Sequence, residues 1–254
     1  KSGVSGAARI TYFDPKHHKT QFACELKGFD VNEFIHRKEA RRMDKFSQYA
    51  LVVTEEAIGD ARLTEGSFNP DRVGVIWGSG IGGLETFQDE AQVLLKAREE
   101  DTGPKFNPFF IPKMIADIAP GNISIKYGFR GPNYTTVSAC ASSSHALIDA
   151  FTYLRLGKAD VIVTGGSEAA VNETGIGGFN ACHALSTNND NPQTASRPFD
   201  STRDGLVLGE GAGAIVLEEY EHAKARGANI YAEIVGGGMS ADAHHMTAPH
   251  PEGL

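Results

Sequence analysis

Short apolar runs that stop at glycine alternate along this chain with segments whose apolar residues have helical spacing. Residues 73–77 form one such run before Gly78, and residues 161–164 form another before a Gly-Gly pair. Residues 84–99 lie between them and have the pattern of an amphipathic helix. Strands that are separated by helices need crossover connections, so the alternation predicts an α/β sheet with parallel pairs. The further expected elements are a helix over 31–60, a Pro-bounded loop over 107–112, strands over 134–139, 213–217 and 230–235, and helices over 147–154 and 218–226.

The composition indicates an ordered globular chain and excludes several classes of function. The 254 residues suit one large domain or two modest ones, with 41% apolar and 22% charged residues. The net charge of −8 argues against general binding of nucleic acids, which need a basic surface. No apolar run approaches the roughly 18 residues of a membrane span, and no basic-then-apolar leader is visible. We therefore expect neither a nucleic-acid partner nor a membrane partner.

The cysteines and the two ends of the chain give further expectations. Cys24, Cys140 and Cys182 are odd in number and widely spaced, without a Cys-x-x-Cys motif. This argues against a disulfide framework or a structural zinc site and favours the reducing cytoplasm. The chain starts at Lys1 without an initiator Met and stops at Leu254 in a loop-like run. This pattern suggests a piece of a longer protein.

The segment around Cys140 is the strongest chemical feature of the sequence. A β-prone run leads into Cys140, and the small residues of the following ASSS segment are suited to open a helix. A thiol at a helix N-terminus faces unpaired N–H groups, which favour the thiolate, and the Cys140 N–H could stabilise an oxyanion. From this context alone, a buried structural cysteine at a strand end remains an equal alternative.

A series of short motifs resembles one family along almost the whole chain. Around Cys140 the sequence is similar to the β-ketoacyl–acyl carrier protein synthases, the elongating condensing enzymes of fatty acid synthesis, and most closely to the type II synthases that use malonyl units. The motifs occur in the family's order, which makes their combination specific. They are GSGIGG at 78–83, NPFFIP at 107–112, VSACAS at 137–142, GGSE at 165–168, GGF at 177–179, ALS at 184–186, SRPFD at 196–200, RDG at 203–205, GEGAG at 209–213 and SADAHHMT at 240–247.

This resemblance implies a fold and a reaction. The fold would be thiolase-like, with α-β-α-β-α layers and duplicated halves. Residues 1–228 would form the N-terminal half without its first strand, and residues 229–254 would open the C-terminal half. Cys140 would take an acyl group from acyl carrier protein and then condense it with a malonyl unit, without a cofactor. The family's two catalytic histidines have no counterpart in this chain, so we expect it not to condense alone and, lacking the first strand, to fold poorly.

The resemblance also assigns roles to residues outside the nucleophile segment. Ile81 matches the gate of the acyl pocket, and Phe179 matches another pocket wall. Ile111 matches the residue that reaches the partner subunit's pocket, which implies a homodimer. His245 and Thr247 match the loop near the substrate entrance. For the first three residues, ordinary core packing is the alternative.

Residues 36–45 concentrate basic side chains in an otherwise acidic chain. With helical geometry, four of them would share one face, because they are spaced at i, i+3, i+4 and i+7. In the family this helix docks the acyl carrier protein, while a solvated charged face is the alternative. The four residues are Lys38, Arg41, Arg42 and Lys45. His183 stands where close relatives often carry Arg, so that contact is expected to be weaker or pH-dependent.

Other motifs favour different functions less well. The segment 78–83 fits the Gly-x-Gly-x-x-Gly fingerprint of dinucleotide binding, but no acidic residue closes a strand about 20 residues later. A thiolase or an initiating synthase also uses a nucleophilic cysteine, but the series of motifs favours the elongating class. A non-catalytic chain-length subunit typically lacks the cysteine.

Several polar residues near the candidate site are not expected to take part in chemistry. Asp242, His244, His245 and His250 lie on one loop, where two adjacent histidines rarely converge on one metal ion, so we expect no metal site. His145, five residues after Cys140, is interpreted as a packed helix residue turned away from the thiol. Cys24 and Cys182 lack the strand–Cys–helix context and are interpreted as structural.

Overall fold

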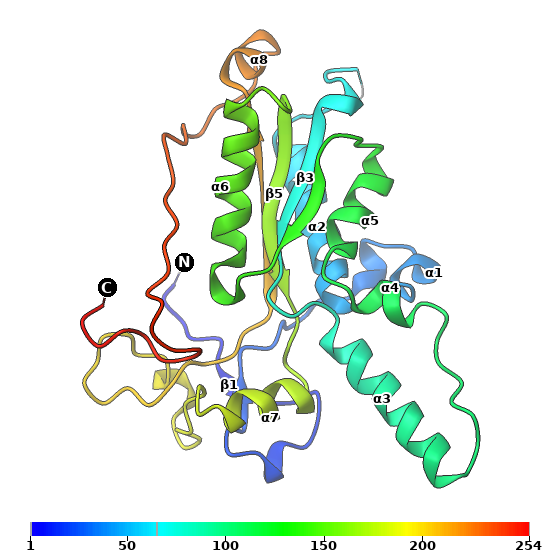
Figure 1. Ribbon diagram of the computed structural model, residues 1–254, viewed down its shortest axis with the longest axis vertical. Coiled ribbons are helices and arrows are strands. Elements are labelled where there is room, and N and C mark those ends of the chain that lie inside the picture. Colours follow the sequence, from blue (N-terminus) through cyan, green and yellow to red (C-terminus); the bar gives the residue numbers. More distant parts are fainter. Residues whose placement is uncertain (1, 65, 254) are drawn as a thin grey trace.

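A four-stranded sheet with the order β4-β3-β5-β6 lies at the centre of the protein (Figure 1). The structure is a computed structural model that describes residues 2–64 and 66–253. The strands are β3 (Val73–Gly78), β4 (Asn133–Thr136), β5 (Val161–Glu168) and β6 (Gly211–Glu218). β3 runs parallel to β4 and β5, whereas β6 runs antiparallel to β5. The predicted α/β sheet with parallel pairs is therefore confirmed.

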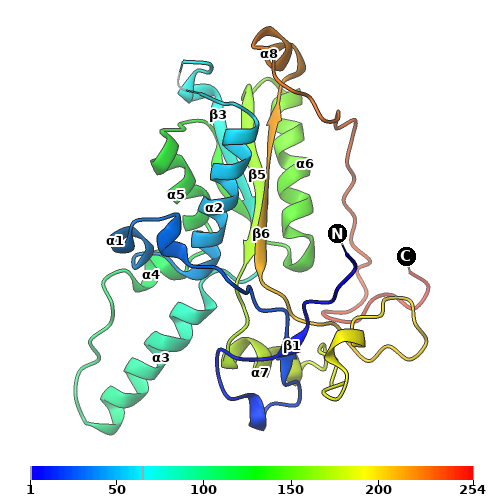
Figure 2. The same cartoon turned by 180° about the vertical axis from the view of Figure 1, so that it is seen from behind.

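Helices cover both faces of this sheet. α2 (Lys45–Asp60) and α5 (Ile118–Tyr127) pack against one face, while α6 (Ser142–Arg155) packs against the other (Figures 1 and 2). The helices between β3 and β4 and the helix between β4 and β5 return the chain so that consecutive strands can pair in parallel. The three layers form one α-β-α unit of the layered fold that the resemblance implied.

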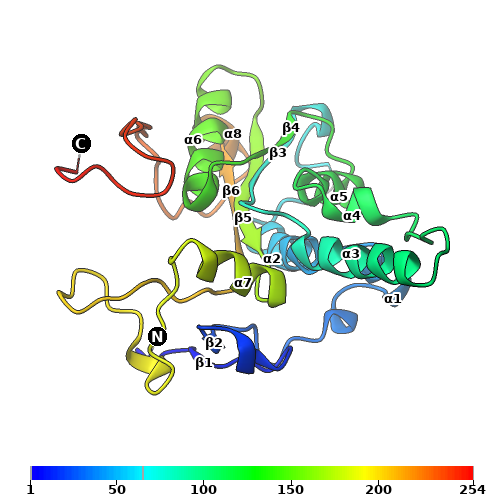
Figure 3. The same cartoon turned by 60° about the horizontal axis from the view of Figure 1, so that its bottom comes forward.

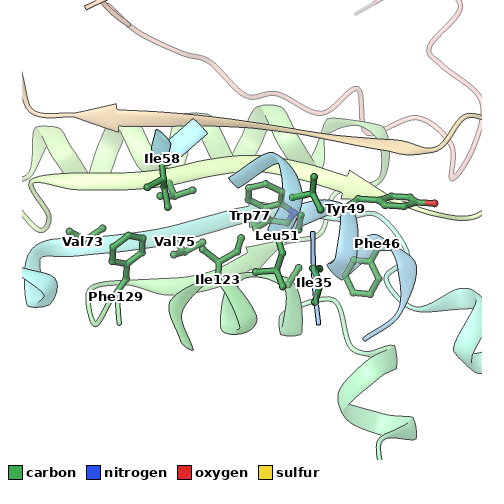
Figure 4. Close-up of a cluster of buried hydrophobic side chains, with 14 of the residues drawn as sticks. Ile35, Phe46, Tyr49, Leu51, Ile58, Val73, Val75, Trp77, Ile123 and Phe129 are labelled. Atoms are coloured by element: carbon green, nitrogen blue, oxygen red, sulfur yellow. The ribbon is translucent and has the colours of Figure 1, made fainter. Parts of the chain in front are cut away.

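β3 is the central strand of the hydrophobic core, and all of its residues are buried. Successive side chains of a strand point to opposite faces, so Val75 and Trp77 pack with α2 and α5, whereas Ile76 packs against α6. Figure 4 shows Trp77 in the first of these clusters with Phe46 and Ile123. Burying each such side chain contributes roughly 1.5–3 kcal/mol. A strand covered on both faces needs an uninterrupted apolar sequence, which this run supplies.

The remaining elements lie around the sheet. The short β1–β2 pair packs beside α7 at the end where β5 finishes (Figure 3), and α3 extends away from the sheet (Figure 1). Among the described residues, no helix is long and apolar enough to span a bilayer. The bounds are β1 (Ala8–Arg9), η1 (Pro15–His17), β2 (Phe22–Ala23), η2 (Val31–Glu33), α1 (Arg37–Ala40), η3 (Pro70–Arg72), α3 (Leu84–Glu99), α4 (Phe110–Met114), η4 (Ala139–Ala141), α7 (Glu173–Ala181), η5 (Pro192–Thr194) and α8 (Tyr220–Ala225).

The single helix predicted over residues 31–60 is wrong, because the chain breaks into η2, α1 and α2 there. The break occurs at Asp44, which has extended backbone angles and precedes α2. Its buried carboxylate accepts hydrogen bonds from the backbone N–H and the hydroxyl of Thr86 at 3.0 and 2.6 Å. The partner lies 42 residues away, so the local sequence does not reveal the break.

Two other predicted elements differ from the structure. The expected loop over 107–112 becomes helical from Phe110, where α4 begins. The strand expected over 230–235 is wrong: residues 229–253 contain no helix or strand. Val235 in this segment is 83% exposed. The hydroxyl of Tyr231 donates a hydrogen bond to the Asp60 carboxylate at 3.1 Å. A strand forms only beside a partner strand, and none lies beside this segment among the described residues.

The β6 edge of the sheet leads to a prediction about the isolated chain. β6 pairs with β5 on one side and has no partner strand on the other within the described sheet, and Ile215 on it is 41% exposed. An open, partly apolar edge favours aggregation over a defined folded state. We expect residues 1–254 expressed alone to melt without a sharp transition when circular dichroism is recorded during heating. A cooperative transition would contradict this expectation.

Candidate active site

Cys140 lies on a sharp turn between the end of β4 and the start of α6. The turn is the single 3-10 turn η4, and Ala139 within it has a φ of 51°, a left-handed value that is uncommon for a residue other than glycine. The Cys140 side chain is exposed. Ala141 precedes the first turn of α6 and offers no side-chain cap. The thiol is therefore exposed beside a helix N-terminus, where N–H groups and the helix dipole favour negative charge.

Ser142 holds this turn in place. Its buried hydroxyl donates to the carbonyl oxygen of Ala139 at 2.7 Å and accepts from the backbone N–H of Ser138 at 2.9 Å. The carbonyl of Ser142 accepts from the Thr136 hydroxyl at 2.8 Å. His145 lies one turn further along α6, and its Nδ1 is 2.7 Å from the hydroxyl of Ser138. His145 is thus a half-buried helix residue engaged with the turn, consistent with a packing role.

Glycines allow the start of α6 to lie directly on the sheet. Gly78 and Gly166 are register partners on β3 and β5. A Cβ placed on Gly78 would lie 2.5 Å from the backbone nitrogen of Ser143, and one on Gly166 would lie 2.0 Å from the Ser143 hydroxyl. Any side chain at these positions would push the first turn of α6 away from the sheet. The glycines at the strand ends therefore determine the position of the turn that carries Cys140.

Glu168, the last residue of β5, binds the glycine-rich loop that follows β3. One carboxylate oxygen accepts from the backbone N–H groups of Gly80 and Ile81 at 2.7 and 3.0 Å. The other oxygen is buried without a hydrogen-bond partner. Burial raises the pKa of Glu168, while the backbone N–H groups of the loop oppose this shift. The N–H groups that a dinucleotide phosphate would need in this motif are thus occupied by a carboxylate of the protein.

The same loop also lies close to the Cys140 turn and contacts α4. A Cβ built on Gly80 would lie 3.6 Å from the carbonyl oxygen of Ala139. The backbone N–H of Gly83 donates to the carbonyl of Met114 at 2.9 Å. The structure therefore brings together three predicted features: the Cys140 turn, the loop with Ile81 and the helix with Ile111. The two isoleucine side chains are 41% and 54% exposed, so ordinary core packing does not account for them.

The other predicted pocket residues lie elsewhere. Phe179 on α7 is half-buried and packs in a cluster with Ile10 and Ile176. His245 and Thr247 are exposed in the C-terminal segment, where Nδ1 of His245 accepts from the backbone N–H of Thr247 at 3.1 Å. These contacts leave the predicted roles at the pocket wall and the entrance as predictions.

The predicted basic surface is formed by α1 and the turn after it. Lys38, Arg41 and Arg42 are exposed. The guanidinium of Arg42 lies 5.2 Å from the ring centroid of Phe109, just before α4. Arg42 therefore lies beside the segment that carries Ile111, and the three exposed basic residues do not follow a single helix.

Lys45 does not share this surface, so the predicted common helical face is wrong. Its ammonium group lies 2.9 Å from the carboxylate of Glu85 and 4.4 Å from the ring centroid of Tyr12. The charge of Lys45 also lowers the pKa of Glu210, although burial raises that pKa by more. The turn before α2 places Lys45 beside Glu85 and Tyr12, where its side chain is 33% exposed.

His183 and the two other cysteines lie at the periphery. His183 is exposed after α7 with a φ of 56°. Cys182 beside it is exposed, and its thiol lies 3.4 Å from the carbonyl oxygen of Phe179. Cys24 is half-buried and unpaired as well, so all three described cysteines are thiols. The sequence analysis interpreted Cys182 as structural, but its side chain is exposed and has no evident packing role.

The sequence reasoning missed the residues that hold the site together: Asp44, Ser142 and Glu168. Glu168 could have been noticed, because an acidic residue at the end of a buried strand is unusual and lies at the carboxyl end of a sheet. In the sequence analysis, Ser142 was one of the small residues after Cys140. The hydrogen bonds of its hydroxyl become evident only from the geometry of the turn. Asp44 acts through a residue far away in sequence and gave no local signal.

Residues 7–223 match the family described as "Beta-ketoacyl synthase, N-terminal domain". The chain belongs to the β-ketoacyl synthase family. It is 50% identical over 252 residues to "3-oxoacyl-[acyl-carrier-protein] synthase 2" of Staphylococcus aureus, covering 99% of this chain and 61% of that protein. The protein of the same name from Vibrio cholerae serotype O1 is 48% identical over 253 residues, with 60% of its length covered. This β-ketoacyl synthase chain thus spans about three fifths of the length of these relatives.

Solved structures of the family have the same fold. A β-ketoacyl synthase from Burkholderia phymatum STM815 superposes with a TM-score of 0.88 at 36% identity, covering 99% of this chain and 61% of that one. A type II PKS acyl-carrier protein in complex with its ketosynthase bound to the hexaketide gives a TM-score of 0.78 at 29% identity, covering 98% of this chain and 59% of that one. The thiolase-like fold that was expected for the N-terminal half is confirmed.

Proposed function

We propose that this chain is the nucleophile-bearing part of an elongating β-ketoacyl–acyl carrier protein synthase of fatty acid synthesis. The observation that carries the proposal is the exposed Cys140 on the strained turn before α6. The relatives at 48–50% identity are named as 3-oxoacyl-[acyl-carrier-protein] synthases, which supports the elongating class over a thiolase.

Acyl transfer is the first step of the proposed reaction. The Cys140 thiolate attacks the carbonyl carbon of an acyl thioester on the carrier protein and expels the carrier thiolate. The bond to Cys140 sulfur forms as the bond to the carrier sulfur breaks. The N–H groups at the start of α6 are placed to stabilise the thiolate and the oxyanion that develops on the carbonyl.

Condensation is the second step. A malonyl thioester loses carbon dioxide, and the resulting carbanion attacks the acyl carbon on Cys140, which leaves as thiolate. The product is a 3-oxoacyl thioester, and the proposed reaction needs no cofactor. In the family two histidines stabilise the enolate, and we propose that this step needs a protein of the relatives' full length.

The remaining roles are part of the same proposal. Ile81 gates the acyl pocket and Phe179 forms its wall, while Ile111 reaches the pocket of a second copy in a homodimer. His245 and Thr247 border the entrance in a C-terminal half that opens near residue 229. The exposure of Ile81 and Ile111 beside the Cys140 turn supports the first and third of these roles. Three unpaired thiols favour a reducing compartment, the cytoplasm.

The basic surface around α1 is proposed to dock the acyl carrier protein. Lys38, Arg41 and Arg42 are exposed and available to an acidic partner, whereas Lys45 is engaged with Glu85. The solved neighbour in which an acyl-carrier protein is bound to its ketosynthase supports a partner of this class.

Reversing two charges on this surface should weaken carrier binding. We expect the variant Lys38→Glu/Arg41→Glu to bind acyl carrier protein roughly tenfold more weakly at low salt, because two exposed attractive charges become repulsive. The difference should shrink in 1 M salt, where the screening length is about 3 Å. Surface plasmon resonance with the complete protein measures both affinities.

Lys158→Glu is the control for the single variant Lys38→Glu, because both change the net charge by the same amount. Lys158 is also exposed but follows the carboxyl end of α6, at the opposite end of that helix from Cys140. An equal loss of affinity in this control would show that net charge, and not the surface around α1, decides binding.

The central experiment measures the covalent intermediate. The complete protein is mixed with acyl–acyl carrier protein, and intact mass is recorded before and after malonyl–acyl carrier protein is added. We expect an adduct of the acyl mass that malonyl–acyl carrier protein discharges. A folded protein that forms no adduct would contradict the proposed function and would favour a non-catalytic relative.

A further inference from the structure

Among the described side chains, Glu168 is the one that joins the loop over residues 79–83 to the end of β5 by hydrogen bonds. Its carboxylate accepts from two successive backbone N–H groups of that loop, at Gly80 and Ile81, with distances of 2.7 and 3.0 Å. The loop tightens itself through a bond from the Gly82 N–H to the Ser79 hydroxyl at 3.2 Å. The loop is thus arranged around an anion that belongs to the protein itself.

The environment of this carboxylate is costly for stability. One of its oxygens is buried without a hydrogen-bond partner, and leaving a buried charged oxygen unsatisfied destabilises a fold. A neutral apolar side chain would avoid this cost, but it could not accept the two N–H bonds of the loop. This loss of stability is consistent with a role of Glu168 in positioning the loop.

The loop that Glu168 holds lies close to the turn that carries Cys140. Gly80 leaves space for the carboxylate, because a Cβ there would lie 2.9 Å from the carboxylate oxygen and 3.6 Å from the carbonyl oxygen of Ala139. Ala139 directly precedes Cys140 in the strained turn. The Glu168 carboxylate is therefore next to the loop, and the loop is next to the turn that carries Cys140.

We propose that Glu168 is a positioning residue, which fixes the loop carrying Ile81 against the Cys140 turn and thereby sets the space in which the acyl group meets the thiol. This inference rests on the proposed acyl transfer for its meaning in catalysis. Glu168 acts through the loop and touches neither the thiol nor the acyl group.

The experiment compares Glu168→Ala and Glu168→Gln with Glu210→Gln in the complete protein. Glu210 is a matched control, because it is also a carboxyl whose pKa is raised by burial and one of its oxygens is also buried without a partner. It accepts from the backbone N–H of Val171 at 3.3 Å, away from the loop. Generic effects of losing a buried carboxylate should therefore appear in both residues.

Two rates are measured for each variant. The first is the single-turnover rate of acyl transfer to Cys140 at saturating and at limiting acyl–acyl carrier protein. The second is the rate of alkylation of Cys140 by iodoacetamide, divided by that of Cys182, which is exposed just after α7 and serves as an internal reference. General unfolding raises both alkylation rates, so their ratio reports the site alone.

We expect Glu168→Ala to lower the saturated acyl-transfer rate at least tenfold, with the half-saturating carrier concentration within twofold of wild type. The released loop should also raise the Cys140:Cys182 alkylation ratio at least threefold. Glu168→Gln should show smaller shifts in the same directions, because its amide oxygen can still accept the two N–H bonds but lacks the negative charge; it also serves if the alanine variant does not fold. Glu210→Gln should leave both quantities within twofold.

A Glu168 variant with wild-type acyl transfer and an unchanged alkylation ratio would overturn the proposal, as would equal effects in Glu210→Gln. If wild-type protein forms no acyl adduct, the proposed function fails, and the alkylation ratio alone then decides whether Glu168 positions the turn.

Discussion

Replacing Cys140 with alanine should abolish the acyl adduct and lower the rate of condensation by at least about a thousandfold, because the covalent step then has no nucleophile. The side chain is exposed, so we expect the free energy of unfolding to change by less than about 0.5 kcal/mol. Intact mass after mixing with acyl–acyl carrier protein, together with urea unfolding, measures the two effects separately.

Cys182→Ala is the natural comparison for this variant. Cys182 is also exposed but follows α7 instead of preceding α6, so no helix N-terminus lies beside its thiol. We expect this variant to form the adduct at the wild-type rate. If Cys182→Ala loses the adduct while Cys140→Ala keeps it, the assignment of the nucleophile is wrong.

Gly78→Ala should produce a large loss of stability. The new Cβ would lie 2.5 Å from the backbone nitrogen of Ser143 and 2.6 Å from the carbonyl carbon of Ser142. Backbone atoms cannot rotate away as a side chain can, so α6 has to shift from the sheet. We expect a loss of about 3 kcal/mol in the free energy of unfolding, measured by urea unfolding of the complete protein at one fixed concentration.

Gly59→Ala makes the same chemical change without the collision. Gly59 is an exposed position of α2, and a Cβ there meets nothing within 4 Å. Because alanine favours a helix over glycine, we expect no loss and a gain of up to about 1 kcal/mol. Equal destabilisation in the two variants would show that the close approach of α6 to β3 does not limit stability. A Gly78→Ala protein with normal stability would show the same.

The sequence predicts those elements that are determined by local pattern. The helix over 84–99 coincides with α3, and the strand over 73–77 is β3 with one more residue. The helix has a clear helical periodicity, and β3 is a continuous apolar run because helices cover both of its faces. The role of Cys140 as nucleophile was predicted from the resemblance to the family, because its local context alone left a structural cysteine as an equal alternative.

Elements that depend on a distant partner were not predictable. The helix over 31–60 is interrupted because the Asp44 carboxylate bonds to Thr86, 42 residues away. The apolar run over 230–235 has strand-like composition, but no strand lies beside it in the described part of the chain. Lys45 has the spacing of the basic surface, yet the turn before α2 directs it to Glu85.

The sequence by itself determined the α/β class and the family, because periodicity and the order of motifs are properties of neighbouring residues, and the same motifs predict that Cys140 is the nucleophile. Only the tertiary structure decided which residues support the site. Ser142 bonds within a turn whose geometry depends on α6, and Glu168 reaches a loop 87 and 88 residues away in sequence. Such contacts depend on how strands pair and helices pack, and these long-range distances are fixed only when the whole sheet has formed.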